Sequence, residues 1–199
     1  MYGRIADEMR RNALAATFAV VALACGGETI SGTTIIESSI PYIQPNTPLS
    51  VGAVRSGNTV ALHAINVLGA AGSCDVFNRV SAANVEGGFE IVVTFPADTQ
   101  PGQYAMADIG AAATARANDR ACEAAYNETT TDGEITLARN DTEVAGFFLL
   151  RFPMSGTTLL QNAEASLCSA PFAPPAAGTC VLLGPCTSSN SITCFELGP

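Results

Sequence analysis

Several residue types are missing from this chain or nearly so. It contains no lysine and no tryptophan, and His63 is its one histidine. Nine basic residues stand against eighteen acidic ones, for a net charge of −9. Nucleic acids and anionic lipids bind proteins through clustered Lys and Arg. The sequence therefore argues against a nucleic-acid partner and against charge-driven adhesion to a membrane surface.

The single histidine limits metal and triad chemistry. Zinc and copper sites usually draw on several His or Cys ligands, and a Ser–His–Asp triad would have to use His63. No Gly-x-Ser-x-Gly motif presents a serine nucleophile. Because His63 lies inside the apolar run 59–68, we predict a buried or half-buried structural histidine, with no metal and no cofactor.

Paired carboxylates are the remaining route to catalysis, because two of them can run glycoside hydrolysis. The candidates are Glu86, Glu90, Asp98 and Asp108. Glu90 alternates with the apolar residues of its segment, so we expect its side chain to point to water. The absence of tryptophan also removes an aromatic platform that sugar clefts commonly use. A carboxylate-dependent hydrolase is therefore the last of the alternatives.

The first 24 residues have the pattern of a secretory signal. Arg10 and Arg11 precede a twelve-residue apolar or near-apolar run, 13–24. A positive segment followed by a short apolar run is typical of such signals, and a helix that spans a membrane needs about 20 apolar residues. Translation from Met9 would give the cleaner signal. We predict that residues 1–24 are removed on export.

The residues at the predicted cleavage site allow two interpretations. Residues 22–25, Ala-Leu-Ala-Cys, resemble a lipobox, in which the cysteine receives acyl chains. The same residues contain Ala-x-Ala, the ordinary signal-peptidase pattern, which would release a secreted protein. We predict lipidation at Cys25, with secretion as the alternative.

The cysteine count favours lipidation. Seven cysteines are present, so a lipidated Cys25 leaves an even number for pairing. Six cysteines in an exported chain indicate three disulfides, and fifteen pairings are possible. The predicted disulfide cysteines are Cys74, Cys122, Cys168, Cys180, Cys186 and Cys194. Three of them lie in the tail, so at least one must pair with the body.

Beyond the signal the sequence predicts an all-β protein. We assign 25–48 to a lipidated N-terminus and tether, 49–168 to a β domain, and 169–199 to a Cys/Pro-rich tail that packs on the domain. Apolar, alternating runs between turn residues predict strands at 59–68, 89–95, 134–139, 143–152 and 157–168. The short turns between them favour antiparallel pairing. The expected architecture is an antiparallel β-sandwich or flattened barrel with a disulfide-stapled C-terminal tail.

Two segments leave alternatives open. The alanine-rich segment 110–126 suits a helix by composition, but its polar residues recur at every second position, so a strand is preferred. Strand 143–152 carries large apolar groups on both faces, at Phe147, Phe148, Leu149 and Leu150. This strand is either covered on both sides or offers an apolar patch to a partner.

The lipobox-like stretch 22–25 and the hairpin residues 133–137 and 144–150, followed by Cys168, carry a resemblance. In these features the chain is similar to small cysteine-containing envelope lipoproteins of unknown function from Gram-negative bacteria, myxobacteria especially. The resemblance implies anchoring through acyl chains on Cys25. Gly26, an uncharged residue after that cysteine, implies the outer membrane. The family offers no catalytic residues to transfer.

These observations favour a non-enzymatic envelope lipoprotein, with a structural role or an envelope protein as its partner. One alternative is a carrier that holds a small apolar ligand inside a β-barrel, in a cavity lined by Phe89, Ile91, Val93 and Phe148. The other is the secreted hydrolase described above.

Overall fold

The computed structural model describes residues 34–47, 49–66, 74, 87–119 and 124–168, all within 32–199, the second of the chain's two units. The strands are β1 (Thr34–Ser38), β2 (Ser50–Ser56), β3 (Thr59–Ile65), β4 (Phe89–Pro96), β5 (Gly102–Ala105), β6 (Ala112–Asn118), β7 (Ala124–Thr130), β8 (Asp132–Asn140), β9 (Glu143–Phe152) and β10 (Thr157–Ser166). A short 3-10 helix, η2 (Met106–Ile109), precedes β6. Among these residues no helix has the length and hydrophobicity needed to span a membrane.

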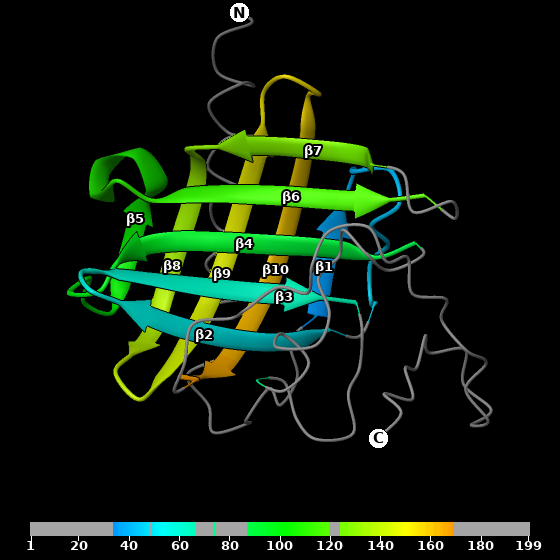
Figure 1. Ribbon diagram of the computed structural model, residues 1–199. Coiled ribbons are helices and arrows are strands. Elements are labelled where there is room, and N and C mark those ends of the chain that lie inside the picture. Colours follow the sequence, from blue (N-terminus) through cyan, green and yellow to red (C-terminus); the bar gives the residue numbers. More distant parts are fainter. Residues whose placement is uncertain (1–33, 48, 67–73, 75–86, 120–123, 169–199) are drawn as a thin grey trace, which may run out of the picture. The chain divides into compact units, whose positions relative to one another are not determined.

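The strands form two five-stranded antiparallel sheets. Sheet A has the order β1-β10-β9-β8-β5, and sheet B has the order β2-β3-β4-β6-β7. In Figure 1 the strands of sheet A run steeply across those of sheet B. The predicted antiparallel β-sandwich is confirmed, and the two sheets are not closed into a barrel.

Strict alternation of apolar residues places the core between the sheets. Phe89, Ile91, Val93 and Phe95 of β4 are each at most 2% exposed, and the residues between them point to the other face. From sheet A, β9 contributes apolar residues at every second position to the same core cluster. Burying each large apolar side chain contributes about 1.5–3 kcal/mol, so this alternation fixes which face of each sheet is inside.

The alanine-rich segment forms strand β6 between residues 112 and 118, as its alternation predicts. Ala113, Ala115 and Ala117 are buried against the core, whereas Thr114 and Arg116 point away from it. The high helix propensity of alanine is overridden here, because β6 pairs with β4 on one side and β7 on the other.

The predicted hairpin at 140–142 is also confirmed. β8 and β9 pair from Asp132↔Arg151 to Asn140↔Val144. At the turn, Oδ1 of Asp141 accepts hydrogen bonds from the backbone amides of Glu143 (3.4 Å) and Thr142 (2.7 Å). These two bonds stabilise the charged carboxylate and lower the pKa of Asp141.

The predicted boundary between the tether and the β domain is wrong. The predicted tether, 25–48, contains β1, which pairs with β10 from Thr34↔Asn162 to Ser38↔Leu159. Ile35 of β1 is fully buried. Five residues of Thr, Ile, Glu and Ser carry no strong signal of their own, and their partner lies more than 120 residues along the chain. The predicted signal and tail, 1–24 and 169–199, lie outside the described residues.

Candidate binding face

Two of the predicted disulfide cysteines are joined. Cys74 and Cys168 form a disulfide with their Cα atoms 5.7 Å apart. The backbone amide of Cys168, just after β10, donates to the carbonyl oxygen of Ala53 in β2 (2.7 Å). The end of sheet A is therefore fastened to sheet B at this point. The remaining predicted positions, Cys25, Cys122, Cys180, Cys186 and Cys194, lie outside the described residues.

His63 lies on β3, on the face of sheet B that points away from the core. Its Nδ1 atom is 3.0 Å from Oε1 of Glu90 on β4, and the two side chains are 21% and 12% exposed. The predicted half-buried histidine is confirmed. Glu90 does face away from the core, but its carboxylate is mostly buried beside His63 rather than open to water. The sequence missed this contact because it depends on how β3 and β4 are paired.

The carboxylates considered for hydrolysis are dispersed. Glu90 is near the start of β4 and Asp98 lies beyond its other end at Pro96; the strand between Glu90 and Pro96 alone spans about 20 Å. Glycosidase carboxylates lie about 5–9.5 Å apart. Asp108 is exposed on η2, and Glu86 lies outside the described residues. In the described ranges, no three His, Cys, Asp or Glu side chains are grouped to hold a metal ion.

A polar cluster joins edge strand β7 of sheet B to the β9–β10 turn of sheet A. The Glu128 carboxylate, on a residue only 7% exposed, accepts hydrogen bonds from the backbone amides of Met154 (2.8 Å) and Ser155 (3.2 Å). The Tyr126 hydroxyl lies 3.0 Å from Glu128 and 3.0 Å from Thr157. Since these contacts connect two elements of the sandwich, the cluster is structural.

Both ionisable groups in this cluster have shifted pKa values. Burial alone would raise the pKa of Glu128, but hydrogen bonds from Ser155, Met154 and Tyr126 outweigh it, and the pKa is lowered. Burial raises the pKa of Tyr126, and its position beside the Glu128 carboxylate adds to the effect. At neutral pH the pair is a charged acceptor and a neutral donor. Apart from the bond between them, the hydrogen bonds of Glu128 and Tyr126 described here all go to the β9–β10 turn or to the first residue of β10.

The outer face of sheet A has an apolar centre, which we define as Phe147, Leu149 and Leu160. All three side chains are half-buried and point away from the core. Leu149 lies directly opposite Leu160 in the pairing of β9 with β10. Sheet B packs on the opposite face of sheet A, and no described strand covers this one. Strand β9 is therefore covered by sheet B on its inner face, and its outer face carries Phe147 and Leu149.

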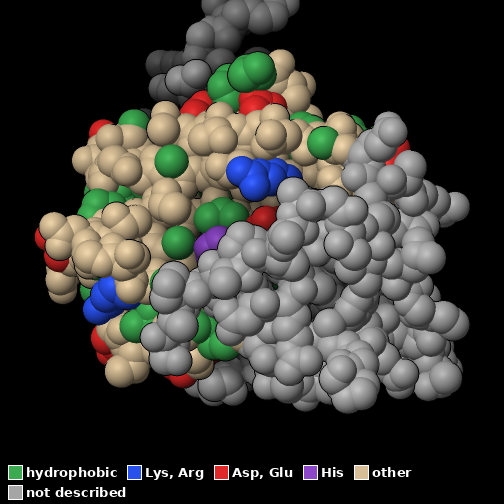
Figure 2. All heavy atoms as spheres, in the orientation of Figure 1, with side chains coloured by type: hydrophobic (Ala, Val, Ile, Leu, Met, Phe, Trp, Pro, Cys, Tyr) green, Lys and Arg blue, Asp and Glu red, His purple; other side chains and the backbone are tan. Residues whose placement is uncertain are grey.

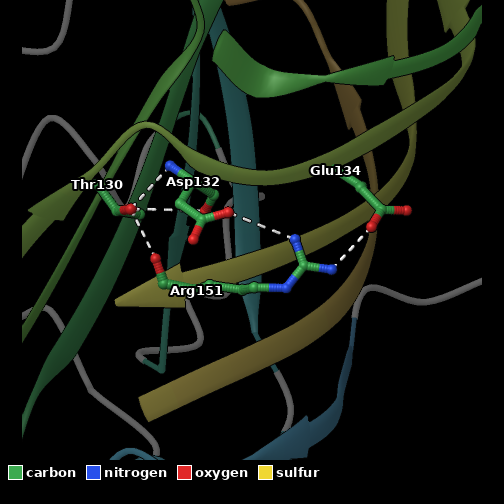
Figure 3. Close-up of polar contacts among 4 residues, drawn as sticks. All are labelled: Thr130, Asp132, Glu134 and Arg151. Atoms are coloured by element: carbon green, nitrogen blue, oxygen red, sulfur yellow. Dashed lines mark hydrogen bonds and ion pairs between the residues drawn. The ribbon is translucent and has the colours of Figure 1, made fainter. Parts of the chain in front are cut away.

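Ion pairs lie at both ends of this apolar centre, and we call them the charged frame. At one end, Arg151 of β9 lies 2.7 Å from Glu134 and 3.5 Å from Asp132, both on β8. Figure 3 shows the guanidinium group between these two carboxylates. The hydrogen bond to Glu134 raises the pKa of Arg151 most, because it stabilises the charged guanidinium group.

Backbone contacts hold this end of the frame in place. The Thr130 hydroxyl donates to the carbonyl oxygen of Arg151 (2.6 Å) and accepts from the amide of Asp132 (2.9 Å). At the other end, Arg139 lies 2.6 Å from Glu143 and 2.5 Å from Glu164. The frame therefore joins β8, β9 and β10 around the apolar centre.

The outer face of sheet B has a different character. Figure 2 shows this face, and on its described part uncharged side chains predominate, with the charged ones scattered among them. Small or β-branched residues occupy its central strands at Ala61, Val92, Thr94 and Thr114. The described part of this face therefore shows neither a large apolar centre nor an organised charged frame.

Among the buried polar side chains of the described residues, one is completely buried. Gln161 of β10 is 0% exposed, and neither Nε2 nor Oε1 of its amide has a hydrogen-bond partner. Its neighbours across the sheet are Phe148 on β9 and Ile35 on β1. Buried polar groups in native proteins are nearly always bonded, so this amide is the one chemically unusual group in the described core.

No family model matches this chain, and searches of curated proteins and of solved structures returned no match either. Sequence reasoning indicated a possible apolar patch on strand 143–152 from the run Phe147, Phe148, Leu149 and Leu150, but it did not say which face the patch would occupy. It did not identify the charged frame. The alternation of Asp132, Glu134 and Thr136 along β8 was a usable signal for charge on one face, but their arginine partner lies on another strand.

Proposed function

We propose that this protein is a non-enzymatic, lipid-anchored module of the bacterial cell envelope that binds another protein through the outer face of sheet A. The observation that carries the proposal is the apolar centre, three large side chains that point away from the core with no described strand over them. An apolar centre inside a polar rim is the usual anatomy of a protein interface.

The sequence supports the anchor. The apolar run 13–24 ends at Cys25, and the first described strand begins at Thr34. Nine residues of chain reach at most about 30 Å when extended. An acylated Cys25 would therefore keep the sandwich close to the membrane, within reach of membrane-bound partners. The spread of Glu90, Asp98 and Asp108 supports a binding role over a hydrolytic one.

The intact mass of the protein, extracted from its native membrane with and without reduction, tests the anchor. We expect a chain that starts at Cys25, carries acyl chains and gains six hydrogens on reduction. An unacylated mass would refute the anchor and favour a secreted protein.

Site-specific photo-crosslinking in intact envelopes tests the binding face. p-Benzoylphenylalanine in place of Phe147 should form a crosslink to one protein. The same group in place of Val92, on the outer face of sheet B, serves as the matched control. Equal crosslinking at both positions, or none at Phe147, would refute the assignment of this face.

A second candidate function is a carrier of a small ligand inside the sandwich. The specific observation in its favour is the unpartnered Gln161 amide, because a ligand with both a donor and an acceptor would satisfy it. Native mass spectrometry of the protein as isolated tests this directly. A small molecule bound to the wild-type protein and lost in Gln161→Met would support the carrier; a ligand-free mass would exclude it.

A further inference from the structure

The charged frame has an excess of negative charge at each end. Arg139 is shared by Glu143 and Glu164, so these three described side chains together carry a formal charge of −1. Arg151 is likewise shared by Asp132 and Glu134.

One further carboxylate borders the apolar centre. Glu37 of β1 is exposed and lies opposite Leu160 in the pairing of β1 with β10. With Glu37, five carboxylates and two guanidinium groups of the described residues surround the three apolar side chains. The described part of the face is therefore apolar at its centre and anionic around it, with a formal charge of −3.

This pattern restricts what the face can bind. An acidic protein or an anionic lipid surface would bring like charges together, which costs free energy and slows association. A purely apolar partner would bury carboxylates without new partners. A partner with an apolar row flanked by Lys or Arg satisfies both parts of the face, since the carboxylates of Glu37, Asp132 and Glu134 have further lone pairs that accept hydrogen bonds.

The frame also sets the length of the partner. Ala145, which pairs with Arg139, and Arg151 are six residues apart on β9, which corresponds to about 20 Å. An α-helix covers that distance in about 13 residues. We infer that the occupant of this face is a basic amphipathic helix of another envelope protein, with apolar side chains in the middle and cationic ones toward both ends. This inference rests on the function proposed above.

Synthetic peptides provide the test. The protein as isolated, held in neutral phosphatidylcholine nanodiscs, is titrated with a fluorescent 14-residue Leu/Lys amphipathic helix. Two further peptides serve as comparisons: the same helix with Glu in place of Lys, and a scrambled Leu/Lys sequence. We expect the basic helix to bind at least ~10-fold more tightly than either of the others, and its affinity to fall as salt rises.

Variants locate the binding site. Leu149→Thr should weaken binding of the basic helix by about 10-fold or more, and Glu134→Gln should weaken it and reduce the salt dependence. Val92→Thr and Asp108→Asn make comparable changes away from the face and should leave binding unchanged. The four variants should unfold at similar urea concentrations, apart from small shifts, which separates lost binding from lost folding.

The outcomes separate the inference from the proposed function. Equal binding of basic and acidic helices, or tighter binding of the acidic one, would overturn the inference. A crosslink at Phe147 to a protein segment without basic residues would overturn it too, while the binding function would stand. No crosslink at Phe147, together with binding to anionic phosphatidylglycerol vesicles that Leu149→Thr abolishes, would overturn both in favour of a membrane-facing surface.

Discussion

Replacing Gln161 with methionine is expected to stabilise the fold. The Gln161 side chain is fully buried, and both polar atoms of its amide lack partners. A buried amide without hydrogen bonds costs about 1–3 kcal/mol relative to one solvated in the unfolded chain. Methionine has nearly the same length and shape and carries no donor or acceptor. We therefore expect Gln161→Met to raise the free energy of unfolding by about 1–3 kcal/mol.

Urea unfolding of the oxidised protein measures this change. The midpoint should rise while the slope of free energy against urea stays constant, which marks a change in stability rather than in compactness. Each kcal/mol corresponds to roughly 2–4 °C in Tm for a chain of this size. Gln103→Met is the matched control, because Gln103 is exposed on edge strand β5; its effect should stay within about 0.5 kcal/mol.

A lower midpoint for Gln161→Met would refute the reasoning. It would mean that the amide is hydrogen-bonded in solution, to an internal water or to a ligand, so that methionine removes an interaction instead of an unpaired group. The mass experiment on the carrier hypothesis would then identify which of the two is bound.

Three further predictions concern the disulfide, the polar cluster and sheet A. The double variant Cys74→Ala/Cys168→Ala opens a link across 94 positions of sequence, so it should lose about 4–5 kcal/mol in urea unfolding; no change would mean that the link is absent in solution. The lowered pKa of Glu128 stabilises the fold fully above its ordinary pKa and progressively less as pH falls through the lowered value. Urea midpoints from pH 7 to pH 3 should therefore show the wild type converging on Glu128→Gln, and a constant gap would contradict this. In Gly146→Ala the new Cβ would lie 2.2 Å from the carbonyl oxygen of Thr136. We expect the free energy of unfolding to fall by at least about 1–3 kcal/mol, and an unchanged Tm would show that sheet A shifts enough to accommodate the methyl group.

Much of the fold was readable from local patterns. The alternation in 89–95 predicted strand β4, the apolar run 143–152 predicted strand β9, and the turn residues 140–142 predicted the hairpin between β8 and β9. These signals work because strand alternation and turn chemistry are properties of a few consecutive residues. The second half of β7 and the short strands β1, β2 and β5 were not predicted as strands, because their local patterns are weak.

The candidate site was only half predictable. The run 147–150 indicated apolar side chains on both faces of a strand, and the structure shows Phe147 and Leu149 on the outer face. The charged frame could not be foreseen. Arg139 and Glu164 are 25 positions apart, and nothing in either segment says that β8 and β10 flank the same strand.

The sequence by itself determined the fold class and the inward face of strands with clear alternation, such as β4 and β6, because burying alternate apolar residues is favourable whichever strands become neighbours. Only the tertiary structure decided which strands share a sheet, which two cysteines meet and what surrounds the apolar centre. Those features depend on contacts between segments that are separated along the chain. Such contacts form only when the whole set of strands is buried together, so no local pattern encodes them.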